Sequence, residues 1–230
     1  SVVAGAVARC VGWLERLSAR SFDRIVAVTE DIARYFPTNK TIVIKNYVSL
    51  KMIDGIKPAE TGNSGTVVIY AGRLSRKRGI AEIVAAMEFT GEGTELWLAG
   101  KWDSTAFEEE CKRLDGWKRT RYLGALPVED VYRYMKVASM GLHCVYLNDY
   151  YVTGLPTKVF EYAACSVPVV MTRCARWEEL FGEFAVFVDP GDPQDIARGI
   201  TGLARDHERG QYMGRKAREF VGRQYNWELE

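Results

Sequence analysis

Two segments of the sequence combine residue types that bind phosphate. In the first, an apolar run over residues 66–71 ends at Gly72, and a basic loop follows within six positions. Its cations are Arg73, Arg76, Lys77 and Arg78. Glycine lets the backbone approach a ligand closely, and clustered cationic donors favour an anion such as a diphosphate. The same pattern also fits a solvated basic loop, so the spacing alone leaves both interpretations open.

The second segment joins a polar and aromatic loop to a predicted helix over residues 156–165. Its candidate binding residues are Thr153, Gly154, Leu155, Pro156, Thr157 and Lys158. We expect the backbone N–H groups of Thr157 and Lys158 to point out of the helix N-terminus, where the helix dipole favours phosphate. Glu161 lies one turn further on and would reach a sugar hydroxyl beside that phosphate. A first-turn acid that complements the dipole is an equally ordinary role for Glu161, as a surface position is for Lys158.

Two further features have weaker signals. A predicted strand ends at Gly124 and a helix begins near Pro127, so the backbone around Leu126 could contact a nucleobase, although an ordinary strand–turn–helix has the same pattern. His143 lies in an apolar strand, which favours a core histidine over a catalyst. Neither His143 nor His207 has the neighbours that a catalytic triad requires.

Short β-branched runs alternate with helical periodicity along most of the chain. The predicted strands cover residues 24–28, 41–45, 66–71, 95–99, 120–123, 141–147, 167–172 and 185–188. The predicted helices cover residues 79–87, 105–114, 127–135, 156–165, 193–204 and 208–223. Continuous apolar strands are typical of a sheet covered on both faces. The pattern predicts an α/β fold, a Rossmann-like, doubly wound parallel sheet whose strands all end at one ligand-binding edge.

Composition excludes several other classes of protein. The 230 residues are 47% hydrophobic and 27% charged, with a net charge of +1, which argues against a strongly basic nucleic-acid binder or an acidic disordered chain. The five cysteines form no C-x-x-C pair, which disfavours a zinc site or a disulfide framework and fits a reducing compartment. We expect no bound metal and no membrane span. A boundary is predicted near residues 47–65, where turn residues gather.

The order of these segments along the chain resembles that in the retaining glycosyltransferases of family four, which have the GT-B fold. The resemblance rests on motifs that follow one another in the family's order from about Asp23 onward. They are the segments 23–30 and 43–46, Gly72-Arg73-Leu74 with Gly79, Tyr122 to Pro127, Gly154 to Ala164 with Val167-Pro168-Val169-Val170, and Phe220 to Trp227. The resemblance implies one half of a GT-B fold. Residues 47–230 would form the domain that binds the nucleotide-sugar donor, and residues 1–46 would be a remnant of the acceptor domain with the interdomain connection.

The resemblance also implies roles for individual residues. Arg73 matches the arginine that contacts the donor diphosphate, and the family's lysine falls on Arg78, with Lys77 one position earlier. Glu161 matches the glutamate that holds the ribose hydroxyls. The family's first glutamate, eight positions before it, is replaced by Thr153, which bears on recognition of the transferred sugar. Pro156 stands where the family commonly has glycine, and the resemblance implies a subtype of active family members that have proline at this position.

The implied reaction is transfer of a sugar from a UDP- or GDP-sugar with retention of configuration, without a cofactor or a required metal. The implied acceptor is a glycan or a lipid-linked molecule, and no nucleic acid takes part. Because the acceptor half is absent from this chain, we expect the chain alone to bind a nucleotide but not to transfer sugar. We also expect a cytoplasmic location, at the inner face of a membrane if the absent half associates with it, and self-association through residues 1–18. Another GT-B enzyme, such as a nucleotide-sugar 2-epimerase, and a non-catalytic nucleotide-binding module remain as alternatives.

Overall fold

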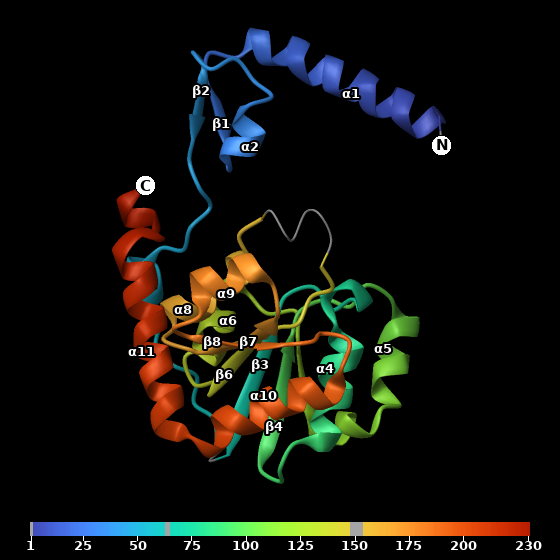
Figure 1. Ribbon diagram of the computed structural model, residues 1–230, viewed down its shortest axis with the longest axis vertical. Coiled ribbons are helices and arrows are strands. Elements are labelled where there is room, and N and C mark those ends of the chain that lie inside the picture. Colours follow the sequence, from blue (N-terminus) through green and yellow to red (C-terminus); the bar gives the residue numbers. More distant parts are fainter. Residues whose placement is uncertain (1, 63–64, 148–153) are drawn as a thin grey trace. The chain divides into compact units, whose positions relative to one another are not determined.

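The chain divides into two compact units. The computed structural model describes residues 2–62, 65–147 and 154–230 of the chain (Figure 1). One unit contains Ser1–Tyr47 with Leu229–Glu230, and the other contains Val48–Glu228. The assignment of the first unit to an acceptor domain stays a prediction. None of the described helices is long and apolar enough to cross a membrane.

The first unit is built from one long helix and a small sheet. The helix α1 (Val2–Ser21) is followed by β1 (Ile25–Ala27), the short helix α2 (Glu30–Ala33) and β2 (Thr41–Val43), and the two strands pair in parallel. Lys40 ties the end of α1 to this unit, because its Nζ donates to the carbonyls of Arg20 and Phe22 at 2.9 Å each. The residues for which we expect self-association, 1–18, lie within α1 apart from Ser1, which is outside the described residues. The helix exposes several apolar side chains within this unit, including Val11, Trp13 and Leu14.

The second unit is built around a six-stranded sheet. Its strands are β3 (Thr66–Ala71), β4 (Thr94–Ala99), β5 (Thr120–Gly124), β6 (Met140–His143), β7 (Val169–Thr172) and β8 (Ala185–Val188). The strand order is β5-β4-β3-β6-β7-β8, and every pair is parallel. The chain therefore winds outward from β3 to β5 and then returns to β6 beside β3. This is the doubly wound order of the Rossmann fold, and the predicted fold class is confirmed.

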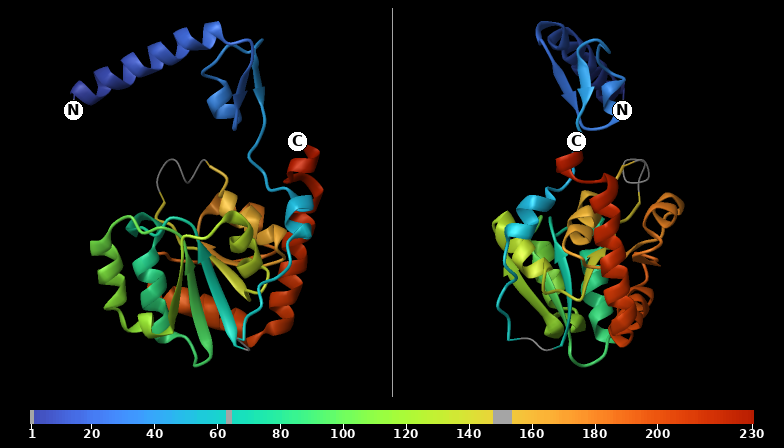
Figure 2. Two further views of the ribbon diagram at one scale, coloured as in Figure 1. Left: turned by 180° about the vertical axis from the view of Figure 1, so that it is seen from behind. Right: turned by 90° about the vertical axis from the view of Figure 1, so that its left-hand side faces the viewer.

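Helices cover both faces of this sheet (Figures 1 and 2). They are α3 (Leu50–Gly55), α4 (Ile80–Ala86), α5 (Thr105–Lys112), α6 (Val128–Met135), α8 (Thr157–Ala164), α9 (Ala175–Phe181), α10 (Pro193–Arg205) and α11 (His207–Gln224). Gly141 pairs with Val169, so Gly141 and Val170 face opposite sides of the sheet. Tyr162 of α8 packs on Gly141, whereas Gly199 of α10 packs on Val170, which places these two helices on opposite faces.

The core of this unit contains the continuous apolar strands that the sequence predicts. In β3, for example, Val67, Val68, Ile69 and Tyr70 are all buried. Two predictions differ in detail: Pro127 and Pro156 stand one residue before their helices, as caps, instead of at the first helical position. The helix α3 was not predicted. It is short, and its N-terminus is capped by Ser49 and by the carboxylate of Glu228, which accepts from the backbone N–H groups of Leu50 and Lys51 at 3.0 Å each.

Candidate functional site

The loop that follows β3 begins with a close contact between two glycines. Gly72 and Gly100 follow the neighbouring strands β3 and β4, and each has a φ of +148°. A Cβ on Gly100 would lie 1.7 Å from the carbonyl oxygen of Gly72, so no side chain fits there. Beyond this contact, Leu74 and Trp102 form an isolated parallel bridge. The loops after β3 and β4 therefore continue side by side past the end of the sheet.

The basic loop, defined here as residues 72–79, packs against the segment that follows β6. It contains a 3-10 turn (Arg76–Arg78) and ends at Gly79, which has a φ of +67°. A Cβ on Gly79 would lie 2.0 Å from the carbonyl oxygen of Cys144. In addition, the backbone N–H of Tyr146 donates to the carbonyl of Lys77 at 3.1 Å. The basic loop thus lies where the strand order reverses between β3 and β6, which is where open α/β sheets bind ligands.

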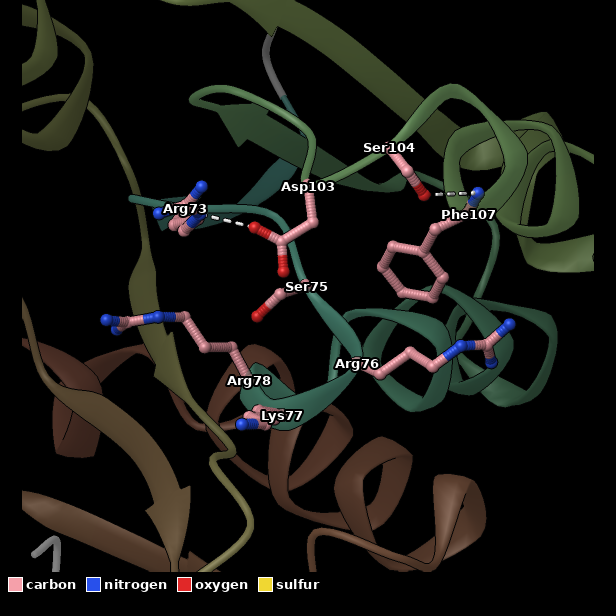
Figure 3. A pocket seen from close by; sticks show the side chains of 8 residues that line it. All are labelled: Arg73, Ser75, Arg76, Lys77, Arg78, Asp103, Ser104 and Phe107. Carbon is pink, nitrogen blue, oxygen red and sulfur yellow. Dashed lines mark hydrogen bonds and ion pairs between the residues drawn. The ribbon is translucent and has the colours of Figure 1, made fainter. Parts of the chain in front are cut away.

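A pocket of about 600 Å³ lies at this loop (Figure 3). Its lining residues are Arg73, Ser75, Arg76, Lys77, Arg78, Asp103, Ser104 and Phe107. The cations of the pocket differ in their partners. Arg73 pairs with Asp103, and Arg76 pairs with Glu110 through both carboxylate oxygens and lies 4.8 Å from the ring of Phe107.

Lys77 and Arg78 differ from these two arginines, because neither forms an ion pair with any residue that the structure describes.

Arg76, in contrast, is held by Glu110. The hydrogen bond between them raises the pKa of Arg76 and lowers the pKa of Glu110. Arg76 is therefore held by protein contacts on the outer side of the pocket. Arg78 is only half-buried and offers its guanidinium group to an anion.

The N-terminus of α8 is the second part of the candidate site. Pro156 is the capping residue, and no side chain of the described residues caps this end of the helix. Thr157 is exposed, Lys158 is half-buried, and Gly154 and Leu155 lead into the helix. Since the first N–H groups of a helix have no partner within it, this end can bind an anion.

Buried contacts of Tyr162 hold α8 against the sheet. Its hydroxyl donates toward the carbonyls of Ile69 and Leu142, at 3.2 and 3.3 Å, and accepts from the N–H of Ala71 at 3.3 Å. Its ring occupies the space that a side chain on Gly141 would need. The helix N-terminus is therefore fixed relative to the ends of β3 and β6.

Lys158 and Glu161 form an ion pair on the first turn of α8. Both side chains are about one-fifth exposed, so the carboxylate is partly shielded but remains open to a ligand. The role of Glu161 at a sugar hydroxyl stays a prediction, and Lys158 is paired with this carboxylate.

His143 lies at the end of β6, between the two parts of the site. The imidazole is buried in the core, as the sequence favours, but its Nε2 atom has no hydrogen-bond partner among the described residues. Burial lowers the pKa of His143 to about 3, and the positive charges of Arg78 and Lys158 contribute to this lowering. Arg78 and Lys158 are 80 positions apart in the sequence, yet both act on the same buried ring. Their charges therefore converge at the end of β6.

Several predicted site residues do not line the pocket, namely Gly72, the residues from Gly154 to Lys158, and Glu161. Leu126 is half-buried against the core between β5 and α6, and it is not among the residues that line the pocket. Thr153 lies outside the described residues. Within residues 2–62, 65–147 and 154–230, no group of three His, Cys, Asp or Glu side chains could hold a metal ion.

Sequence reasoning missed Asp103, Glu110 and the role of Tyr162. Asp103 follows the strand next to β3, so the rule that parallel strands end at one edge could have placed it near the basic loop. Glu110 lies on the charged helix α5, where nothing distinguishes it from Glu108 or Glu109 in sequence.

Comparison with known proteins identifies the family. The family model described as glycosyl transferases group 1 matches residues 56–220. The chain belongs to this family. The match covers the whole sheet and both parts of the candidate site.

Proteins with known names match at low identity. The α-maltose-1-phosphate synthase of Mycolicibacterium smegmatis is 22% identical over 246 residues, which cover 94% of this chain and 62% of that protein. Among solved structures, HepE of Anabaena in complex with UDP-glucose has a TM-score of 0.69 at 16% identity, over 89% of this chain and 60% of that one.

A solved structure of an isolated domain matches as well. The C-terminal domain of LpcC from Francisella tularensis, a group 1 glycosyl transferase, has a TM-score of 0.64 at 18% identity, over 78% of this chain and 99% of that one. At these identities the structures show a shared fold. The chain spans less than two-thirds of the length of the synthase that it matches.

Proposed function

We propose that the chain is the donor-binding part of a glycosyltransferase and binds the diphosphate of a UDP- or GDP-sugar at the basic loop and the α8 N-terminus. The convergence of these two features at the switch point between β3 and β6 carries the proposal. Cations and free helix N–H groups are complementary to a diphosphate, and a bound nucleoside would extend toward Glu161. Support also comes from HepE, which shares the fold and whose crystal structure is a complex with UDP-glucose.

In the proposed reaction, a hexosyl group leaves the donor diphosphate and is transferred with retention of configuration. Arg73, Arg78 and the N–H groups of Thr157 and Lys158 would stabilise the negative charge that develops on the departing diphosphate. Glu161 would accept hydrogen bonds from the ribose hydroxyls. The acceptor, a glycan or a lipid-linked molecule, and the residues that bind it would belong to a part of the protein outside this chain.

Titration calorimetry with UDP and GDP tests the donor site directly. We expect at least one nucleotide to bind, and Arg78→Ala to weaken its binding about 10- to 100-fold, because a hydrogen bond to a charged group contributes about 1.5–3 kcal/mol. Arg76→Ala is the matched control, since it removes an arginine that Glu110 already holds. We expect this control to bind within about threefold of the wild type.

Two outcomes would contradict the proposal. One is that neither nucleotide binds to the folded wild-type chain. The other is that Arg78→Ala and Arg76→Ala have equal affinities, since the basic loop would then act only through its total charge.

A further inference from the structure

Asp103 is fixed opposite Arg73 by the backbone. The N–H of Leu74 donates to the carbonyl of Lys101 at 2.9 Å, and the N–H of Asp103 donates to the carbonyl of Leu74 at 3.0 Å. These bonds extend the pairing of β3 and β4 by one step, so the position of Asp103 depends on the sheet and not on a free loop. Figure 3 shows its carboxylate reaching across the edge of the pocket to the guanidinium group of Arg73.

The contact between the two side chains uses one part of the guanidinium group. Asp103 accepts the hydrogen bond of Nε through its Oδ1 atom. Neither Nη atom of Arg73 has an acceptor in the described part of the chain. A guanidinium group that is held at Nε still has both terminal nitrogens free to donate, and these can bind a phosphate through two hydrogen bonds.

Arg73 needs such a partner because it is otherwise poorly restrained. Its side chain is 68% exposed, and a long exposed side chain loses rotamer freedom when it is ordered on a ligand. A partner that restricts the side chain beforehand removes part of that cost from the binding step. The partner's own negative charge has the opposite effect, because it repels an anion in the same pocket.

We propose that Asp103 is a positioning residue that holds Arg73 in the orientation in which it binds the phosphates of the nucleotide donor. This inference rests on the proposed function of the basic loop, and it adds a residue that contributes through Arg73. It also gives a physical reason for a carboxylate inside a pocket that binds an anion. The benefit of orienting Arg73 exceeds the repulsion that the carboxylate causes.

Two substitutions separate the orientation from the charge. Asp103→Asn removes the charge but keeps an oxygen that can accept the Nε hydrogen bond, whereas Asp103→Ala removes both. Because both variants lose the same charge, their difference reports the hydrogen bond. We expect Asp103→Ala to bind UDP or GDP about three- to tenfold more weakly than Asp103→Asn, in calorimetric titrations at one salt concentration.

A double-mutant comparison shows whether the effect passes through Arg73. In the Arg73→Ala background, the difference between Asp103→Ala and Asp103→Asn should disappear, because the group that Asp103 orients is gone. Melting temperatures of all variants, measured without nucleotide, check that each is folded. A purely structural role of Asp103 would change the melting temperature but would leave the two single variants with equal nucleotide affinity.

The outcomes distinguish this inference from the function on which it rests. If Arg73→Ala weakens nucleotide binding but Asp103→Ala and Asp103→Asn bind equally, the positioning role is wrong and the donor site stands. If Asp103→Ala binds more tightly than Asp103→Asn, Asp103 competes with the ligand for Arg73 and the inference is also overturned. If Arg73→Ala leaves the affinity unchanged, the role of Arg73 in the donor site is wrong, and the inference is overturned with it.

Discussion

The basic loop and the α8 N-terminus both face the end of β6, but they are held in place by different means. The basic loop presents long cationic side chains, of which the exposed Arg73 and Arg76 pair with carboxylates of a neighbouring loop and helix. The α8 N-terminus presents backbone N–H groups, and buried contacts of Tyr162 fix them to the sheet. The first part supplies charge that needs orienting, whereas the second supplies weaker dipoles that are already oriented.

The two parts should therefore contribute to anion binding in different ways. Side chains adapt to a ligand and carry a full charge, but ordering them costs conformational entropy. Helix N–H groups carry only a partial charge, but they need no ordering when the ligand arrives. Losing the Tyr162 contacts that hold α8 should therefore act mainly on stability, and losing a cation of the basic loop should act mainly on affinity.

The largest expected effect comes from breaking the attachment of α8. Tyr162→Ala should lower the free energy of unfolding by about 3–5 kcal/mol, because it leaves a cavity in the core beside Gly141. Tyr162→Phe keeps the ring and should cost only about 1 kcal/mol. Urea unfolding monitored by circular dichroism measures both values. Equal losses for the two variants would mean that the hydroxyl, and not the packing of the ring, fixes α8.

A smaller effect tests whether the two parts share one electrostatic environment at His143. The pKa of His143 is lowered from 6.5 to about 3 in the folded protein, so the unfolded chain takes up a proton below pH 6.5 that the folded chain does not. The folded state therefore loses about 2 kcal/mol of stability between pH 6.5 and pH 5 from this residue. His143→Gln should lack this loss, when urea unfolding is measured at both pH values.

The matched control for that measurement is His207→Gln, which changes an exposed histidine of α11. It should retain the pH dependence of the wild type. If His143→Gln also retains the wild-type pH dependence of stability, the His143 imidazole is not held neutral near Arg78 and Lys158. Removing either cation should raise the pKa of His143, and proton NMR titration of the ring measures that change.

The smallest effect separates the sugar of the nucleoside from its phosphates. Glu161→Gln should weaken UDP binding about tenfold, because a carboxylate that accepts ribose hydroxyl bonds is lost. Its affinity for inorganic pyrophosphate should stay within about twofold. Arg78→Ala, in contrast, should weaken both ligands. Competition titrations with the two ligands measure the ratio, and an equal loss of UDP and pyrophosphate affinity in Glu161→Gln would place Glu161 at the phosphates.

The sequence predicts the sheet well because the strands of this fold are buried on both faces. The run at residues 66–71 is apolar throughout, and β3 occupies the same residues. The helix α3 could not be predicted in this way, since the carboxylate that caps it belongs to Glu228, 178 positions from Leu50. Local periodicity contains no information about such a partner.

The sequence predicts which cations belong to the candidate site, but it does not predict the contacts that hold the site in place. Arg73 and Arg78 are recognisable because they cluster after a strand that ends in glycine. The ion pair of Arg73 with Asp103 spans 30 positions, and the hydroxyl of Tyr162 bonds residues up to 93 positions away. These contacts depend on the crossover connections that bring distant strands together. They become visible only when the strand order is known.

The contact between Gly72 and Gly100 limits how this site can diverge. The loop after β4 cannot gain a side chain at Gly100 without displacing the backbone of Gly72, whereas a Cβ on Gly72 would meet only the side chain of Tyr70, at 3.4 Å or more. Changes in ligand preference must therefore arise further out, among residues 73–78 and 101–104. In a library randomised over both loops and selected for folded protein, position 100 should return glycine almost without exception, while position 101 should vary freely.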